Sequence, residues 1–600
     1  MYYKNANFYK YFVRPIVSEF PFFLLFALFL LPKTVYYINT SFWDWENYPL
    51  FRYFSLAFLY SYIITLVVYY TKCKWIKYLL YFLSIIINLI SFFLAFNFKS
   101  SISPATMLLV AETNYSESSE FLCQYVFSQR SLICYALVII LILIICFSEK
   151  YYKRYKPILA NIKFFNIIIS IFILTILLGG IYSFRYNVNM FKCKSTVDID
   201  DWMVSNFCLP MDNISNLMYC CYDLKLCGNE LKYAIEATQN SLYNVKTDSF
   251  TNNINIIVVI GESYIKSHSF LYGYPLNTTP YLTKEKNKGN LFVFTNVVSP
   301  YNTTSKSLKN VFSCNSLSEG EKWFSKPYFP SIFKYSGYNV YFWDNQYDMN
   351  SNASYDFSLN SYLHNAYISK ITYTDINKDI YKYDGELIDS FKKNIHLKSH
   401  NNLVLFHLMG QHSNAYKRYP HTEQFDHFNK DSVLSFRKEK YLTEWKLTSI
   451  AVYDNATLYN DFVINSIILM FKHTNSILVY FSDHGEEIYD VRDYSGRTHE
   501  PNPASDVLRC QYEVPFIIWC SDIFIKNNKR LVEDIKNSIN KPFSIENVCH
   551  LLFKIGNIKT NNYISNRCIL DNNYKYSHRI INDNIDYDEI VNSIYNQNKQ

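Results

Sequence analysis

One stretch decides the fold of the C-terminal part of the chain: residues 256–263, which read IIVVIGES. Five apolar residues lead into a glycine and then into the acid Glu262, as in a buried strand that ends on an ionisable side chain. Ligands of open α/β sheets bind at the carboxyl ends of the strands. The stretch therefore predicts a strand that carries Glu262 to a ligand-binding edge.

A second stretch repeats this pattern at residues 477–486, which read ILVYFSDHGE. Its strand ends on Asp483 and His484, which offer an oxygen and a nitrogen ligand of the kinds that suit Zn²⁺. Either stretch alone also fits an ordinary helix N-cap after a strand. Other short β-branched runs alternate with helical stretches, at residues 338–342, 403–408 and 515–519. The alternation predicts an α/β domain with a largely parallel central sheet.

Hydroxyl groups crowd residues 299–307, SPYNTTSKS, just before a helical stretch at 308–313. A threonine at a helix N-terminus is by default a cap. The functional interpretation is a nucleophile, because metal coordination lowers the pKa of a hydroxyl and the helix dipole favours an anionic phosphate. Two histidine segments, at residues 407–412 and 497–501, complete a candidate site at successive strand ends.

Composition divides the chain into two unlike parts. Half of the residues are apolar and only 18% are charged, below the roughly 25% of soluble chains, yet the mean hydropathy is −0.07. The apolar residues gather before residue 185, in stretches long enough, or nearly so, to cross a bilayer. These stretches are residues 20–38, 53–70, 78–96, 131–147 and 164–184. We therefore expect a transmembrane domain with five helices over residues 1–185.

Positively charged residues orient these spans. Lysine and arginine precede the first span and recur between the second and third and between the fourth and fifth, whereas the alternate loops hold fewer. The positive-inside rule then places the N-terminus in the cytoplasm and everything after the fifth span outside. The outer parts that we expect are a loop with an interfacial segment at 97–130, a connector at 186–250, a catalytic domain at 251–570 and a loosely ordered polar tail at 571–600.

Cysteine content and net charge narrow the class of protein further. Ten of the fourteen cysteines, from Cys193 onward, fall in the expected outer part, where disulfides can persist. Their connectivity cannot be read from sequence. The net charge of +7 is mild and dispersed, which argues against nucleic acid as a partner.

These elements, in this order and after five spans, resemble the bacterial phosphoethanolamine transferases of the alkaline-phosphatase/sulfatase superfamily. The most specific match runs through residues 261–280, from GES through HSFLYGY to NTTP. Residues 453–455 and 482–486 match as well. The resemblance covers essentially the whole chain. It implies a transmembrane domain joined to a sulfatase-like α/β domain.

The resemblance also implies a zinc site with a threonine nucleophile. The ligands that it implies by position are Glu262, Thr304, Asp483 and His484. Thr304 is the nucleophile in this alignment, because the family's threonine precedes a Phe-Ser pair, here Phe312 and Ser313, by eight and nine residues. Thr303 stays the alternative.

Residues for the two substrates follow from the same resemblance. The family's substrate-site histidines fall on His412 and His499, which we expect to bind phosphoryl oxygens or to move a proton. Its loop residues for the lipid donor fall on Thr113 and Glu117, although Leu109 stands where a polar residue is expected.

Two departures from the family pattern concern the acceptor. Members that modify lipid A usually flank the nucleophile with a cysteine pair, and here the matching positions are Pro300 and Asn310. Residues 337–346, GYNVYFWDNQ, resemble instead the branch that modifies the lipopolysaccharide core.

The reaction implied is a ping-pong transfer of phosphoethanolamine from phosphatidylethanolamine to a lipopolysaccharide acceptor, either lipid A or a core sugar or phosphate. We expect a monomeric, multi-pass protein of the bacterial inner membrane with its catalytic domain in the periplasm. One alternative is a phosphoglycerol transferase of the same superfamily, and another is a non-catalytic membrane receptor for lipid or glycan. A sulfatase is disfavoured, because the Cys/Ser-x-Pro-x-Arg sequence of that class is missing around Thr304.

Overall fold

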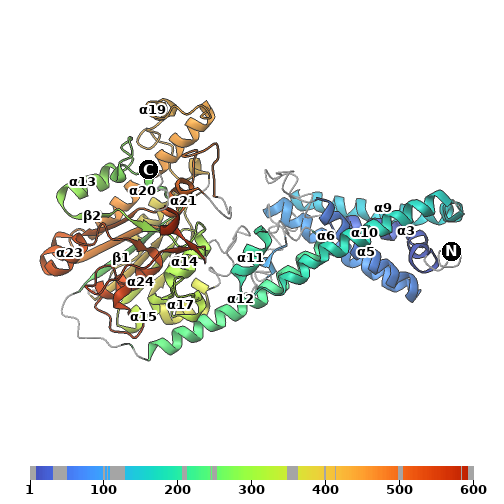
Figure 1. The fold of residues 1–600 in the computed structure, drawn as a ribbon, viewed down its shortest axis with the longest axis horizontal. Helices are drawn as coiled ribbons and strands as arrows, with labels where there is room; N and C mark the ends of the chain where they lie inside the picture. The colour runs from blue at the N-terminus through green and yellow to red at the C-terminus, as the bar shows by residue number, and fades with distance from the viewer. Residues whose placement is uncertain are drawn as a thin grey trace. The chain divides into compact units, whose positions relative to one another are not determined.

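The structure is a computed structural model that describes residues 9–31, 50–98, 102–104, 106–107, 129–161, 163–205, 212–243, 245, 253–346, 362–397, 400–412, 414–497, 504–582 and 584–591. The chain divides into two compact units. They are Met1–Asn229 with Asn350–Phe357, and Glu230–Met349 with Ser358–Gln600. The first unit holds the apolar helices and the second holds the sheet (Figure 1).

Apolar helices build the first unit. Within the described residues, four are long and apolar enough to cross a membrane: α5 (Leu50–Thr71), α6 (Lys74–Phe98), α9 (Gln129–Asn161) and α10 (Lys163–Met190). A fifth candidate span is the pair α2 (Arg14–Ser18) and α3 (Phe20–Phe29), which follows a π-helical turn at Tyr9–Val13 and bends by 81°. This agrees with the predicted set of apolar N-terminal helices. The first expected span continues to residue 38, and its part beyond residue 31 lies outside the described residues.

The packing within this unit suits a lipid environment. Asn88 on α6 turns its amide inward and donates from Nδ2 to the carbonyl oxygen of Phe29 at 2.9 Å, so a buried polar group has a partner. On α10 large apolar side chains remain exposed, among them Ile171 at 61% and Leu178 at 67%. An extended apolar surface of this kind marks contact with lipid or with another apolar partner.

The expected connector at residues 186–250 is largely helical. Helix α10 extends to Met190, and α11 (Thr196–Ser205) and α12 (Asn213–Leu242) follow it. Residue 230 of α12 is also where the second unit begins. The polar residues of this segment are therefore consistent with helices that each expose one face to solvent.

A seven-stranded sheet forms the centre of the second unit. Its order is β2-β8-β7-β1-β6-β4-β5. The strands are β1 (Asn255–Gly261), β2 (Leu291–Phe294), β4 (Asn339–Asp344), β5 (Asp375–Ile376), β6 (Asn402–His407), β7 (Ser476–Ser482) and β8 (Phe516–Cys520). Neighbouring strands from β7 to β5 pair in parallel, and only β8 runs antiparallel to its neighbours β7 and β2. The predicted largely parallel sheet is confirmed.

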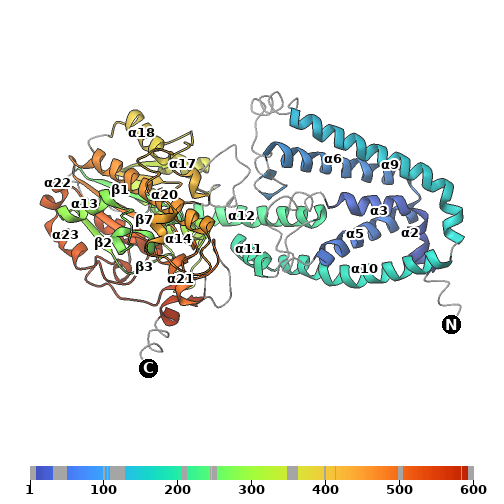
Figure 2. The same ribbon diagram turned by 90° about the horizontal axis from the view of Figure 1, so that it is seen from above.

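Helices cover both faces of this sheet (Figure 1, Figure 2). Successive side chains of a strand point to opposite faces, and β1 accordingly sends Ile256, Val258 and Ile260 into one core and Ile257 and Val259 into the other. The helices are α13 (Pro280–Lys288), α14 (Thr304–Phe312), α15 (Phe329–Tyr335), α17 (Ala366–Thr372), α18 (Asp384–Asn394), α19 (Lys430–Leu434), α20 (Glu444–Phe471), α21 (Ser505–Tyr512), α22 (Asp522–Asn527), α23 (Lys529–Lys536) and α24 (Val548–Ile555). Burial of both faces explains why the strands read as continuous apolar runs.

Part of the expected polar tail is folded. Short strands β10 (Ile580–Ile581) and β11 (Ile585–Asp586) pair as an antiparallel hairpin. Ile581 and Tyr587 are buried in a small cluster with Val298, Leu508 and Tyr512. Arg579 and Asp588 form an ion pair in which both side chains are 7% exposed. This hairpin is more ordered than the loose tail that we expected after residue 571, because a few widely spaced apolar residues anchor it in a polar sequence.

Candidate metal and active site

The central strand β1 carries Glu262 to the carboxyl edge of the sheet. Strand β1 lies between β6 and β7, and Ile260 pairs with His407 on one side and Phe481 on the other. The segments that follow these three strands therefore meet at one edge. Glu262 is completely buried there, as expected for a side chain enclosed by the loops above a parallel sheet.

A strained turn holds the Glu262 side chain in place. Ser263 has a φ of +53°, in the left-handed region that costs a non-glycine residue energy. In this conformation its hydroxyl donates to Glu262 Oε1 at 2.8 Å, and its backbone N–H donates to Asp483 Oδ1 at 3.1 Å. One residue thus orients both carboxylates.

The loop after β6 packs directly against the backbone of Glu262. Gly410 has a φ of +49°, and a Cβ atom at this position would lie 2.8 Å from both the nitrogen and the oxygen of Glu262. The neighbouring N–H of Gln411 donates to the Glu262 carbonyl oxygen at 3.0 Å. Only glycine fits this approach, which explains its place in the segment at 407–412.

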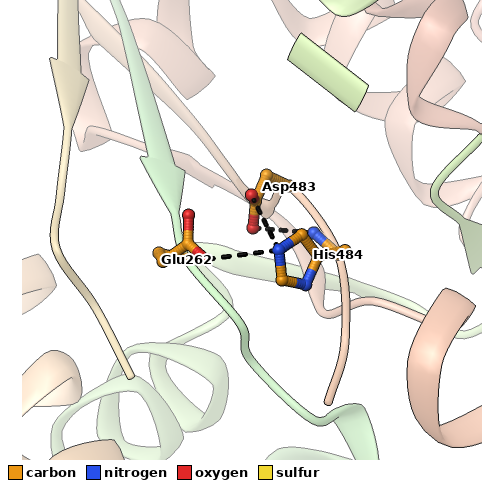
Figure 3. Close-up of side chains that lie close together, drawn as sticks. All are labelled: Glu262, Asp483 and His484. Carbon is orange, nitrogen blue, oxygen red and sulfur yellow. Dashed lines mark hydrogen bonds and ion pairs between the residues drawn. The ribbon is translucent and has the colours of Figure 1, made fainter. Parts of the chain in front are cut away.

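Asp483 and His484 follow β7 and face Glu262 (Figure 3). His484 Nδ1 is 2.6 Å from the carbonyl oxygen of Gly485 and donates to it, which leaves the lone pair on Nε2. Nε2 lies 3.2 Å from Glu262 Oε1 and 3.3 Å from Asp483 Oδ2. One ligand atom from each of the three residues lies within 4.8 Å of the others. This is the only such group of three found in the described parts of the chain.

Thr304 brings a hydroxyl to the same point. It is the first residue of α14, and its Oγ1 donates to Glu262 Oε2 at 2.9 Å and lies 3.3 Å from His484 Nε2. Thr303 is the residue before the helix, and its hydroxyl is buried without a hydrogen-bond partner in the described residues. Of the two threonines, Thr304 is the one in contact with the Glu262 and His484 side chains.

The buried carboxyl and imidazole groups of this site shift one another's pKa. Burial opposes ionisation of Glu262, but His484 and His412 lower its pKa well below its usual range. Burial and the nearby Glu262 raise the pKa of Asp483 well above its usual range. Burial and the charge of Arg497 lower the pKa of His484. Two buried carboxyl groups this close ionise together only with a positive charge between them.

The donor set fits Zn²⁺. Asp483 Oδ2 is buried and has no hydrogen-bond partner among the described residues. Together with a Glu262 oxygen, the Nε2 lone pair of His484 and the Thr304 hydroxyl, it offers the mixed nitrogen and oxygen ligands that zinc takes in four-coordinate sites. The four residues that the resemblance implied as ligands are therefore close enough to share one ion.

Two residues that reach this group stand in stretches quoted above, although neither was given a role in the expected site. Gln346 follows β4 and donates from Nε2 to Glu262 Oε2 at 3.1 Å and to the Leu408 carbonyl oxygen at 2.7 Å. Arg497 places Nη1 2.7 Å from His484 Nε2. The position of Gln346 just after a strand was a usable signal, whereas nothing in the sequence around Arg497 pointed to His484.

The expected substrate residues are described only in part. His412 follows β6, and its backbone N–H donates to the Met409 carbonyl oxygen at 3.2 Å. Burial opposes ionisation of Glu262, and His412 is one of the groups that nevertheless lower the pKa of that carboxyl. His499, Thr113 and Glu117 lie outside the described residues. Every cysteine in the described parts is a free thiol, so no disulfide pairing is assigned.

Known proteins resemble this chain over most of its length. The model of the Sulfatase family matches residues 254–543. Phosphoethanolamine transferase EptC of Escherichia coli (strain K12) is 27% identical over 504 residues, which cover 81% of this chain and 82% of the relative.

Solved structures agree with this match. The C-terminal periplasmic domain of EptC from Escherichia coli is 29% identical and superposes with a TM-score of 0.50 over 57% of this chain and 95% of that domain. The integral membrane protein EptA from Neisseria meningitidis is 16% identical and shares the fold with a TM-score of 0.51 over 93% of this chain and 98% of that protein. The chain is a membrane protein with a Sulfatase-family domain at residues 254–543, and over most of its length it is similar to enzymes named phosphoethanolamine transferases.

Proposed function

We propose that this protein transfers phosphoethanolamine from phosphatidylethanolamine to lipopolysaccharide, with Thr304 as the nucleophile. The observation that carries the proposal is the position of the Thr304 hydroxyl, 2.9 Å from Glu262 Oε2 and 3.3 Å from His484 Nε2. A threonine that served only as a helix cap would turn its hydroxyl to the backbone of α14. Here it joins the carboxylates and imidazole that suit a metal.

Glu262, Asp483, His484 and the Thr304 hydroxyl would hold Zn²⁺. When bound, zinc lowers the pKa of a coordinated hydroxyl and offsets negative charge that develops on a phosphoryl group. Glu262 accepts the hydrogen bond from Thr304 and so fixes its oxygen at the start of α14. The helix N-terminus adds a partial positive charge that favours the anionic phosphate.

The reaction has two displacement steps. In the first, Thr304 Oγ forms a bond to the phosphorus of the donor, the bond to the diacylglycerol oxygen breaks, and that oxygen takes up a proton. In the second, a hydroxyl or phosphate oxygen of the acceptor attacks the phosphoethanolamine-threonine, and Thr304 regains its proton. His412 and His499 are the residues that we assign to phosphoryl binding or proton transfer.

The membrane unit supports a lipid donor and a lipid-linked acceptor. We place the helices in the bacterial inner membrane and the Sulfatase-family domain in the periplasm, in a monomer, with Thr113 and Glu117 in the loop that meets the donor. The named relatives transfer phosphoethanolamine, which supports this reaction over phosphoglycerol transfer and over a receptor without activity. The acceptor that we favour is the lipopolysaccharide core, because residues 337–346 resemble the branch of the family that modifies it.

Two measurements test this proposal. Purified protein in detergent should release fluorescent diacylglycerol from phosphatidylethanolamine labelled on an acyl chain, and Thr304→Ala should abolish the release while Thr303→Ala retains it. Mass spectrometry of lipopolysaccharide from cells with and without the gene should show one added phosphoethanolamine, and its position identifies the acceptor. Equal release by the Thr304→Ala variant would rule the mechanism out.

A further inference from the structure

Arg497 contacts the atom that a metal ion would need. Its Nη1 lies 2.7 Å from His484 Nε2 and donates to the carbonyl oxygen of Asn302 at 3.2 Å. Its Nε lies 3.5 Å from a carboxylate oxygen of Glu486. The Arg497 side chain is 26% exposed, whereas Glu262 and His484 are fully buried. A solvent-accessible guanidinium thus reaches inward to the buried group.

The contact with His484 excludes a metal at the same nitrogen. Nδ1 of His484 donates to Gly485, so Nε2 has one lone pair, and it accepts a hydrogen bond from Arg497 in this structure. The same lone pair cannot bind Zn²⁺ at the same time. Arginine remains charged at any pH that the protein meets, so its guanidinium and a metal ion would compete for His484.

The Arg497 guanidinium lies a short distance from the Thr304 hydroxyl. Nη1 is 2.7 Å from His484 Nε2, which is itself 3.3 Å from Thr304 Oγ1. Nη1 and the hydroxyl oxygen are therefore no more than about 6 Å apart, the sum of these two distances. The Asn302 carbonyl, two residues before Thr304, holds the same Nη1 atom on the side of α14.

The chemistry of the transferred group matches this position. A phosphodiester carries one negative charge on two non-bridging oxygens, and further negative charge develops as the threonine oxygen attacks. Two carboxylates already offset the charge of a divalent ion at this site, so the ion alone leaves the phosphoryl oxygens short of positive charge. A planar guanidinium donates two parallel hydrogen bonds to such a pair of oxygens.

We propose that Arg497 is a catalytic residue that exchanges ligands: it leaves His484 when zinc binds and then binds the non-bridging oxygens of the phosphoethanolamine group. The proposal rests on the transfer reaction proposed above. Arg492 on the same loop differs, because its Nε is 3.3 Å from both oxygens of the buried Glu487 carboxylate. Arg492 is thus a structural arginine and supplies the matched control.

The test compares Arg497→Met, Arg497→Lys and Arg492→Met in the full-length protein in detergent. The first measurement is zinc affinity, by competition with a chromogenic chelator and without any lipid. Because Arg497→Met removes a group that competes for His484, this variant should bind zinc at least as tightly as the wild type. Weaker zinc binding in Arg497→Met would overturn the ligand exchange, since it would mean that Arg497 supports the metal site.

The second measurement is diacylglycerol release by the zinc-loaded proteins. Loss of one preorganised donor to a developing charge lowers the rate about 100-fold, so we expect that loss in kcat for Arg497→Met. We expect Arg497→Lys to recover part of the kcat, because lysine keeps the positive charge but lacks the planar guanidinium. Arg492→Met should release diacylglycerol at the wild-type rate. Wild-type kcat in Arg497→Met would overturn the proposal while the transfer reaction stands. A wild-type protein without any release would instead contradict the proposed function itself.

Discussion

A buried histidine supports the loop that carries the candidate ligands. His268 donates from Nδ1 to Asp454 on α20 at 2.7 Å and from Nε2 to Asp490 at 2.8 Å. Because both ring nitrogens face carboxylates, the ring is an imidazolium in the folded protein. Burial alone would lower the pKa of His268, but Asp490 and Asp454 overcome that effect and raise the pKa to about 10. Asp490 lies six residues after His484, so this cluster fixes the path of that loop.

The stabilisation that charged His268 gives the folded protein follows from its pKa. A rise from 6.5 to about 10 corresponds to about 5 kcal/mol of stabilisation of the folded state, at roughly 1.4 kcal/mol per unit. Burial raises the pKa of Asp454, which offsets part of this gain, so we expect the His268→Gln change to cost about 3–5 kcal/mol. Because the folded-state pKa is the higher one, the stabilisation is complete below pH 6.5 and is lost as the pH rises to about 10.

Denaturant unfolding of the full-length protein in detergent at pH 6, 8 and 10 measures this effect. The difference between wild type and His268→Gln should be largest at pH 6 and should shrink towards pH 10. His578→Gln is the control, because His578 pairs with Asp586 at the surface and its side chain is 60% exposed. A cost that stays constant from pH 6 to 10 would refute the reasoning, since it would assign the role of His268 to packing against Tyr274 and not to its charge.

Two further predictions concern close packing and the C-terminal hairpin. Gly410→Ala should weaken zinc binding at least tenfold in the chelator competition, because the added Cβ would press on the backbone of Glu262. Gly289→Ala is the control: this residue also has a positive φ but faces open space, so its substitution should leave zinc binding unchanged. Asp588→Asn breaks a buried ion pair and should lower the free energy of unfolding by about 3 kcal/mol, whereas exposed Glu589→Gln should not change it.

Much of the fold and part of the site could be predicted from the sequence. Strand ends are visible as apolar runs that stop at ionisable residues, so Glu262, Asp483 and His484 could be singled out before their contacts were known. That a parallel sheet brings such ends to one edge follows from the α/β pattern. Thr304 could be separated from Thr303 only by resemblance, because both hydroxyls stand at the start of the same helix.

What the sequence did not show depends on contacts made through the tertiary structure. The segment at 497–501 was singled out for its histidine, but no period or spacing marks the approach of Arg497 to His484. The folded hairpin near Ile581 was missed because a few apolar residues and one buried ion pair anchor a polar segment. In both cases the deciding partners are distant in the chain or belong to no regular element.

The covalent intermediate on Thr304 tests the central claim most directly. Wild-type protein is mixed with phosphatidylethanolamine in detergent without an acceptor, quenched, digested and analysed by mass spectrometry. We predict one phosphoethanolamine on the peptide that contains Thr304, localised to that residue by fragmentation, present in Thr303→Ala and absent from Thr304→Ala. An adduct on Thr303 or on another residue, or diacylglycerol release at the wild-type rate by Thr304→Ala, would contradict the account.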